Sequence, residues 1–119
     1  MERVHLDEYI REQQAKMRDY CLVLLKFTPK SYEIGSESAA LVEHAGKNFE
    51  LHEKGILKII CPVFENPQLR GLYIFDAGIE QVKEIMEADP AVREGIFEYE
   101  VYPCRSLPLA SPEEEELAE

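Results

Sequence analysis

Histidines and carboxylates are the residues of this chain whose types suit acid–base chemistry. The histidines are His5, His44 and His52, and the last two fall eight residues apart in one predicted helix. At about 100° per residue their side chains point about 80° apart, which is not the i, i+4 spacing of a helical zinc site. The sequence also lacks H-E-x-x-H, G-x-S-x-G, G-x-G-x-x-G and phosphate-loop motifs. We therefore expect no metal and no organic cofactor.

Asp89 is the candidate partner for His44, because a carboxylate orients an imidazole that acts as a general acid or base. If the helices that hold them run parallel on one sheet face, His44 lies about 10 Å along the first and Asp89 about 15 Å along the second. Two side chains can bridge that offset of about 5 Å. The simpler alternatives are a half-buried helical His44 with one hydrogen bond, and an Asp89 that caps a helical turn beginning at Pro90. Spacing alone does not decide between them.

Hydrophobic periodicity predicts the elements that position this pair. In chain order they are a helix over 5–19, a strand over 20–28, a helix over 37–54, strands over 56–61 and 69–75, a helix over 79–86, a helical turn over 89–94 and a strand over 96–102. After the N-terminal helix the order is βαββαβ. We therefore expect an α+β protein with a ferredoxin-like fold and an extra N-terminal helix.

The predicted strands carry apolar residues on both faces. Helices cover only one face of a ferredoxin-like sheet, so the other face should alternate with polar residues. Residues 20–25 and 72–75 have almost no polar position. The N-terminal helix can cover part of the second face, and a second copy of the sheet can cover all of it. We expect a two-fold homodimer packed sheet to sheet.

Length, charge and cysteine usage exclude several classes of protein. The length of 119 residues and the hydrophobic content of 45% suit one globular domain. The net charge of −11 disfavours nucleic-acid and membrane partners. We expect no signal peptide, no membrane span and, from three cysteines without metal-ligand spacing, a cytoplasmic protein with reduced thiols. The expected layout is an N-terminal helix over 1–19, the main domain over 20–104 and a mobile acidic tail over 105–119.

Several segments of the main domain resemble the YCII-related (YciI-like) family. The clearest is Ala88–Pro103, ADPAVREGIFEYEVYP, which is similar to the family's D-P-x-V turn, glycine and final strand. His44 and Gly55, followed by an apolar strand and Pro62, are similar to the family's histidine-bearing helix and the strand after it. The other similar segments are Tyr20–Pro29 and Leu69–Asp76.

The resemblance implies a dimeric α+β barrel in which His44 and Asp89 form the proposed catalytic pair. The family's reactions are mostly unassigned; one is elimination of chloride from a chlorinated hydroxyquinol. The wider fold includes muconolactone-type isomerases and cofactor-free oxygenases. Two positions depart from the family pattern: Cys61 stands where a glycine usually precedes the proline, which narrows any pocket there, and Thr28 stands where a glycine often precedes the first proline.

Our first hypothesis is a small cofactor-independent enzyme acting on a small polar cyclic or aromatic substrate by elimination, isomerisation or hydrolysis. His44 is then the general base or acid, and Asp89 holds its tautomer. The alternatives are a non-catalytic dimeric module that binds a ligand or a partner protein, and a cofactor-free oxygenase. A pocket with His44 at its wall favours the enzyme, and a filled core favours the module. The tyrosines that either line such a pocket or pack in the strands are Tyr73, Tyr99 and Tyr102.

Overall fold

The computed structural model describes residues 2–35 and 38–110. These residues form an α+β structure with four α-helices, one 3-10 helix and a four-stranded antiparallel sheet. In chain order the elements are α1 (Arg3–Ala15), β1 (Arg18–Phe27), η1 (Pro29–Glu33), α2 (Ala39–Glu53), β2 (Leu57–Pro62), β3 (Leu69–Phe75), α3 (Ile79–Ala88), α4 (Pro90–Arg93) and β4 (Phe97–Ser106). The expected α+β class is confirmed, and the arrangement is compatible with a ferredoxin-like fold.

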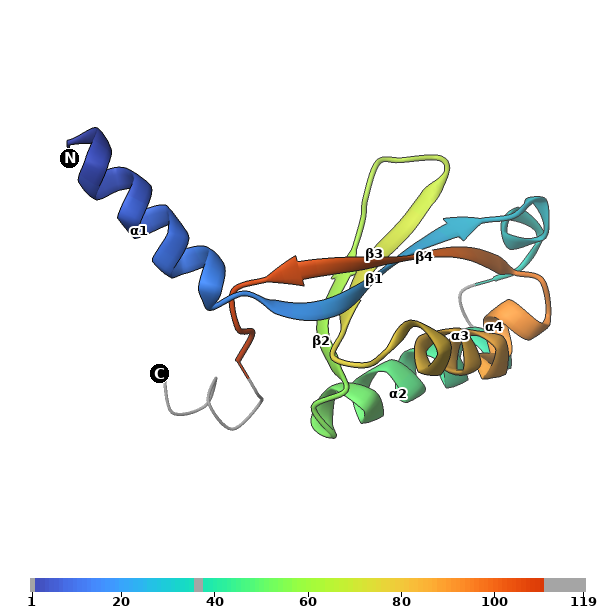
Figure 1. The fold of residues 1–119 in the computed structure, drawn as a ribbon. Coiled ribbons are helices and arrows are strands. Elements are labelled where there is room, and N and C mark those ends of the chain that lie inside the picture. Colours follow the sequence, from blue (N-terminus) through green and yellow to red (C-terminus); the bar gives the residue numbers. More distant parts are fainter. Residues whose placement is uncertain (1, 36–37, 111–119) are drawn as a thin grey trace, which may run out of the picture.

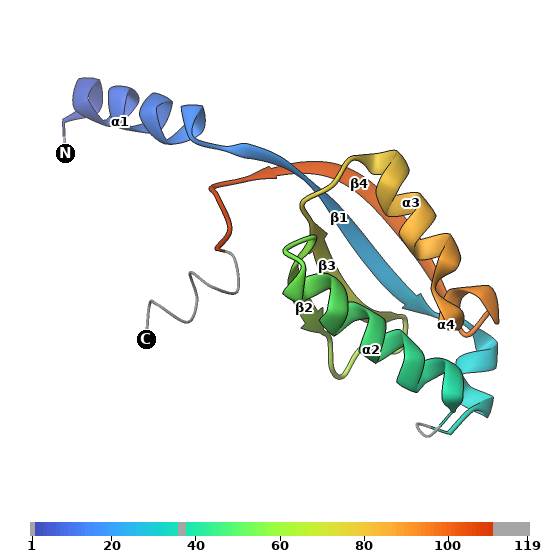
Figure 2. The same cartoon turned by 90° about the horizontal axis from the view of Figure 1, so that it is seen from below.

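β1 lies inside the sheet, whose strand order is β2-β3-β1-β4. Val23 lies opposite Tyr73 of β3 on one side and Val101 of β4 on the other. All three strand pairs are antiparallel. Figures 1 and 2 show α2, α3 and α4 on one face of the sheet, while none of the described helices covers the other face.

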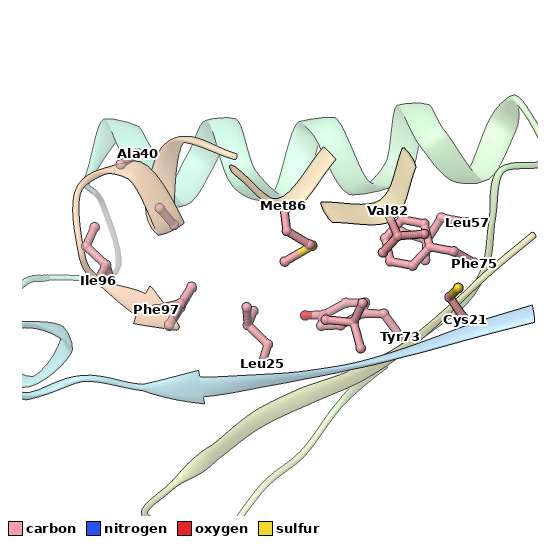
Figure 3. Close-up of a cluster of buried hydrophobic side chains, with 12 residues drawn as sticks. Cys21, Leu25, Ala40, Leu57, Tyr73, Phe75, Val82, Met86, Ile96 and Phe97 are labelled. Carbon is pink, nitrogen blue, oxygen red and sulfur yellow. The ribbon is translucent and has the colours of Figure 1, made fainter. Parts of the chain in front are cut away.

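The hydrophobic core fills the space between this sheet and its helices (Figure 3). On β1, Val23 and Leu25 are fully buried, whereas Leu22 and Leu24 are only half-buried on the opposite face. α3 contributes Val82 and Met86, which lie one helical turn apart and are both buried. Burying a side chain of this size contributes about 1.5–3 kcal/mol. The largest fully buried side chains are Phe75, Leu25, Leu57, Ile96, Val23 and Val82.

α2 and α3 run in opposite directions across the sheet (Figures 1 and 2). Each helix returns against the direction of the strand before it, and β1 and β3 are themselves antiparallel. The parallel helices assumed from the sequence are therefore wrong. In the antiparallel arrangement the end of α3 and the short α4 lie beside the first half of α2, and this places Asp89 within reach of His44.

α1 projects away from the sheet and has no buried residue (Figure 1). It ends at Ala15, earlier than the predicted residue 19, because Arg18 and Asp19 already pair with β4 as part of β1. α1 therefore does not cover the second face of the sheet in this chain. None of the described helices is both long and apolar enough to span a bilayer.

β4 continues through Pro103 to Ser106, beyond the predicted end at residue 102. Proline lacks an N–H donor, but β4 is an edge strand, and the backbone groups on its outer edge need no partner strand. Arg105, placed in the tail by the sequence, instead pairs with Asp19 through a 2.9 Å ion pair. The last nine residues of the predicted acidic tail, 111–119, lie outside the described residues.

Candidate active site

His44 lies on the buried face of α2, one turn after Ala40. Its exposed fraction is only 5%, and that of Asp89 is 4%. Ser38 occupies the N-cap of α2 without a side-chain cap bond. Ala40 and His44 are both buried and lie four residues apart, so they define the face of α2 that packs toward α4 and β4.

Asp89 joins α3 to α4 and contacts His44 directly. Its Oδ1 lies 2.7 Å from Nδ1 of His44. Its Oδ2 accepts hydrogen bonds from the backbone N–H groups of Ala91 at 3.0 Å and Val92 at 3.2 Å. These backbone contacts are an N-cap, and they hold the carboxylate in one orientation. Both roles considered for Asp89, helix cap and partner of His44, are present in its contacts.

The other ring nitrogen of His44 lies next to Asn48, one helical turn later. Asn48 Nδ2 is 3.3 Å from Nε2 of His44. An amide N–H can only donate, so Nε2 accepts, and Nδ1 carries the proton that it donates to Asp89. The contacts thus agree on one neutral tautomer, in which the lone pair on Nε2 is available to take a proton.

A pocket of about 520 Å³, partly open to solvent, has His44 in its wall. The polar residues in the described part of its lining are Ser31, His44 and Arg70. The rest of the lining is mostly apolar and includes Phe27, Ile34, Leu41, Ile96 and Phe97. The Phe97 ring packs edge-on against the imidazole, with ring centroids 5.4 Å apart. An apolar pocket with a few polar groups is the usual form of a small-molecule site.

The remaining sequence candidates lie elsewhere. His5 is exposed on α1, and His52 is bonded through Nδ1 to the carbonyl of Leu57 at 2.8 Å. None of the three candidate tyrosines lines the pocket beside His44: Tyr73 packs in the core, Tyr99 bonds to Glu87 and Tyr102 is exposed. Within residues 2–35 and 38–110, no three His, Cys, Asp or Glu side chains gather as a metal site requires.

Burial and nearby charges raise the pKa of two of these tyrosines, Tyr73 and Tyr99. Burial raises the pKa of Tyr73, and the Asp89 carboxylate adds to the shift while the Arg70 guanidinium opposes it. Tyr99 loses water contact and donates to Oε1 of Glu87 at 2.6 Å, and the two effects raise its pKa to about 12. Both phenols therefore stay protonated near neutral pH.

Sequence reasoning missed Asn48, Phe97 and Arg70. Asn48 had a usable signal, because residues four apart face the same side of a helix. Phe97 was predicted only as a strand residue. Nothing in the sequence pattern places Arg70 in the pocket, because its direction depends on an irregularity in the pairing of β1 with β3.

No protein-family model matches the chain, and no curated protein matches it. The chemistry of the site therefore follows from its own residues. An oriented imidazole beside an apolar pocket, whose unprotonated nitrogen is held only by a long amide contact, can abstract a proton from a bound molecule and return it.

Proposed function

We propose that the protein is a cofactor-independent acid–base enzyme acting on a small cyclic or aromatic substrate. His44 is the general base and then the general acid, acting through Nε2. Asp89 holds the Nδ1–H tautomer and stabilises the imidazolium that forms. The observation that carries the proposal is the buried 2.7 Å contact between these two side chains, of which His44 lies in the wall of a pocket.

The reaction begins when an acidic C–H or O–H of the substrate takes the place of the Asn48 amide at Nε2. The 3.3 Å contact of that amide is long for a hydrogen bond, so it is readily exchanged. Nε2 takes the proton, and the electron pair left on the substrate either expels a leaving group or accepts the proton at another atom. The first outcome is an elimination and the second an isomerisation.

The fold assignment belongs to the same proposal. The strand order β2-β3-β1-β4 with helices on one face supports a ferredoxin-like fold, and with it membership of the YCII-related family. The uncovered face of the sheet is largely apolar, which supports a homodimer packed sheet to sheet as a dimeric α+β barrel. The apolar side chains on that face are Leu22, Leu24, Ile59, Leu72, Ile74 and Tyr102.

Solvent deuterium exchange tests the proposal without knowledge of the product. The protein is incubated in D₂O with a panel of cyclic keto acids, lactones and hydroxyquinols, and deuterium gain, isomerisation or leaving-group release is followed by NMR and mass spectrometry. We expect at least one compound to react or exchange, with a loss of about 100-fold or more in His44→Gln. His52→Gln is the matched control, because His52 bonds a backbone carbonyl on another face of α2.

Two results would overturn the proposal. The first is activity that His44→Gln leaves unchanged. The second is a panel in which compounds bind the pocket but none reacts or exchanges, which favours the non-catalytic binding module.

A further inference from the structure

Among the described residues that line the pocket beside His44, only Arg70 carries a permanent charge. Arg70 is half-buried on β3, and its guanidinium carbon lies 6.0 Å from the centre of the Phe97 ring. The imidazole of His44 packs against the edge of the same ring. Phe97 therefore forms a wall shared by the cation and the proposed base.

A β-bulge directs Arg70 into this pocket. Leu25 lies opposite Gly71, but the next residue, Lys26, lies opposite Leu69, so Arg70 is the extra residue of the pair. In a regular strand, Arg70 would share a face with Leu72, which is the face away from the helices. A bulge shifts this alternation and turns the extra side chain to the other face, and Arg70 does line the pocket on the helix side.

In the described part of the chain, the charge of Arg70 has no carboxylate partner. None of the described residues that line the pocket is acidic, although the whole chain carries a net charge of −11. A half-buried guanidinium beside apolar walls lacks much of its hydration, and an anion that reaches it forms strong, charge-assisted hydrogen bonds.

We infer that Arg70 is a substrate-binding residue and that the pocket takes a small anion: a ring that carries a carboxylate or a comparably delocalised oxyanion. The ring lies against Phe27 and Phe97, the oxyanion contacts Arg70, and the acidic C–H or O–H faces Nε2 of His44. This inference rests on the proposed function, because it names the substrate class of the same pocket. It also gives Arg70 a second effect, since a cation there stabilises negative charge that develops on the substrate.

Benzoate and benzamide are suitable probes, because they have the same shape and differ in charge. Binding is measured by titration of ¹⁵N-labelled protein, with the resonances of His44 and Phe97 as reporters. We expect the wild type to bind benzoate about 10-fold or more tightly than benzamide, and Arg70→Gln to remove the difference. Arg70→Lys keeps the charge without the planar fork, so its loss is intermediate.

Arg11→Gln is the matched control, because it removes the same charge from the exposed helix α1 and should leave benzoate binding unchanged. An unchanged His44 resonance in Arg70→Gln shows that the pocket is intact. Equal binding of both probes by the wild type, or an undiminished preference for benzoate in Arg70→Gln, would overturn the inference.

The outcome is separate from that of the deuterium-exchange assay. If charge-dependent binding is present but His44→Gln exchanges protons normally, then the anion site stands and the acid–base role fails. If the exchange depends on His44 but Arg70→Gln binds benzoate as the wild type does, then the acid–base role stands and the anion site fails.

Discussion

Asp89 gives one carboxylate oxygen to His44 and the other to the backbone of α4. The first contact, at 2.7 Å, orients the imidazole, and the second caps the helical turn that begins at Pro90. Because a single side chain makes both contacts, the position of the imidazole is tied to the start of α4. The imidazole also packs against Phe97, the first residue of β4. The hydrogen bonds that cap α4 thus also hold the Asp89 carboxylate in position for its contact with His44.

Removal of this carboxylate should cost stability by two routes. Asp89→Ala loses the cap, worth about 0.5–2 kcal/mol, and leaves a buried imidazole N–H unpaired, worth about 1–3 kcal/mol. We therefore expect a loss of about 2–4 kcal/mol in urea unfolding. Asp89→Asn should lose less, because its amide oxygen still caps α4.

Asp19→Ala is the control for this series. Asp19 also pairs with a cation, Arg105, but its side chain is 84% exposed. Asp19→Ala should therefore lower the free energy of unfolding by less than about 1 kcal/mol. A stability of Asp89→Ala equal to that of the wild type would show that neither contact of Asp89 matters in solution.

Gly71 should be intolerant of a side chain. A Cβ at this position would lie 2.9 Å from the hydroxyl of Tyr73 and 3.1 Å from two ring carbons. Tyr73 is buried and cannot easily move, so we expect Gly71→Ala to cost about 1–3 kcal/mol. Gly46→Ala is the matched control. Gly46 lies within α2, and a Cβ there would meet no other atom within 4 Å, so alanine should raise the free energy of unfolding by about 0.5–1 kcal/mol. Thermal unfolding compares the two, and a stable Gly71→Ala would contradict the packing of Tyr73.

The contact between Tyr99 and Glu87 makes the free energy of unfolding depend on pH in the alkaline range. The folded pKa of Tyr99 is about 12, above the ordinary value of 10.0, so the protonated form is favoured in the folded state. This contribution is complete below pH 10.0 and is lost as the pH rises toward about 12. The difference between wild type and Tyr99→Phe in unfolding free energy should shrink across that range. Titration of Tyr99 near pH 10 in the folded protein, measured by ultraviolet difference absorbance, would rule this out.

The proposed dimer makes the uncovered face of the sheet sensitive to charge. Leu24 lies between Leu72 and Glu100 on that face, so Leu24→Glu would place an unpaired carboxylate at the dimer contact. We expect sedimentation to show a dimer for the wild type and a monomer for Leu24→Glu. Phe49→Glu should remain a dimer, because Phe49 is 61% exposed on α2, on the opposite side of the sheet. A wild-type monomer at micromolar concentration would disprove sheet-to-sheet packing.

The local pattern of the sequence predicts much of the fold and less of the site. The apolar run Leu69–Phe75 gives the third strand with its observed bounds, and Asp89 before Pro90 marks the cap of α4. Local pattern carries no information about tertiary pairing, however. It predicts that the last strand ends at residue 102, before Pro103, although an edge position tolerates proline, and it gives no sign of the bulge at Arg70.

The pairing of His44 with Asp89 was predicted for a partly wrong reason. The two residues meet because antiparallel helices bring the end of α3 to the first half of α2, and not because of equal depth along parallel helices. The direction of the helices depends on how β1 and β3 pair, which a single sequence does not state. Their catalytic role remains a prediction.

The tautomer of His44 tests the central claim most directly. Long-range ¹H–¹⁵N NMR of histidine-labelled protein distinguishes a protonated Nδ1 from a protonated Nε2. We expect the neutral imidazole of His44 to carry its proton on Nδ1, hydrogen-bonded to Asp89, and to exchange that proton slowly with solvent. A neutral His44 protonated on Nε2 would contradict the account, because the nitrogen that is free of Asp89 would then have no lone pair with which to act as a base.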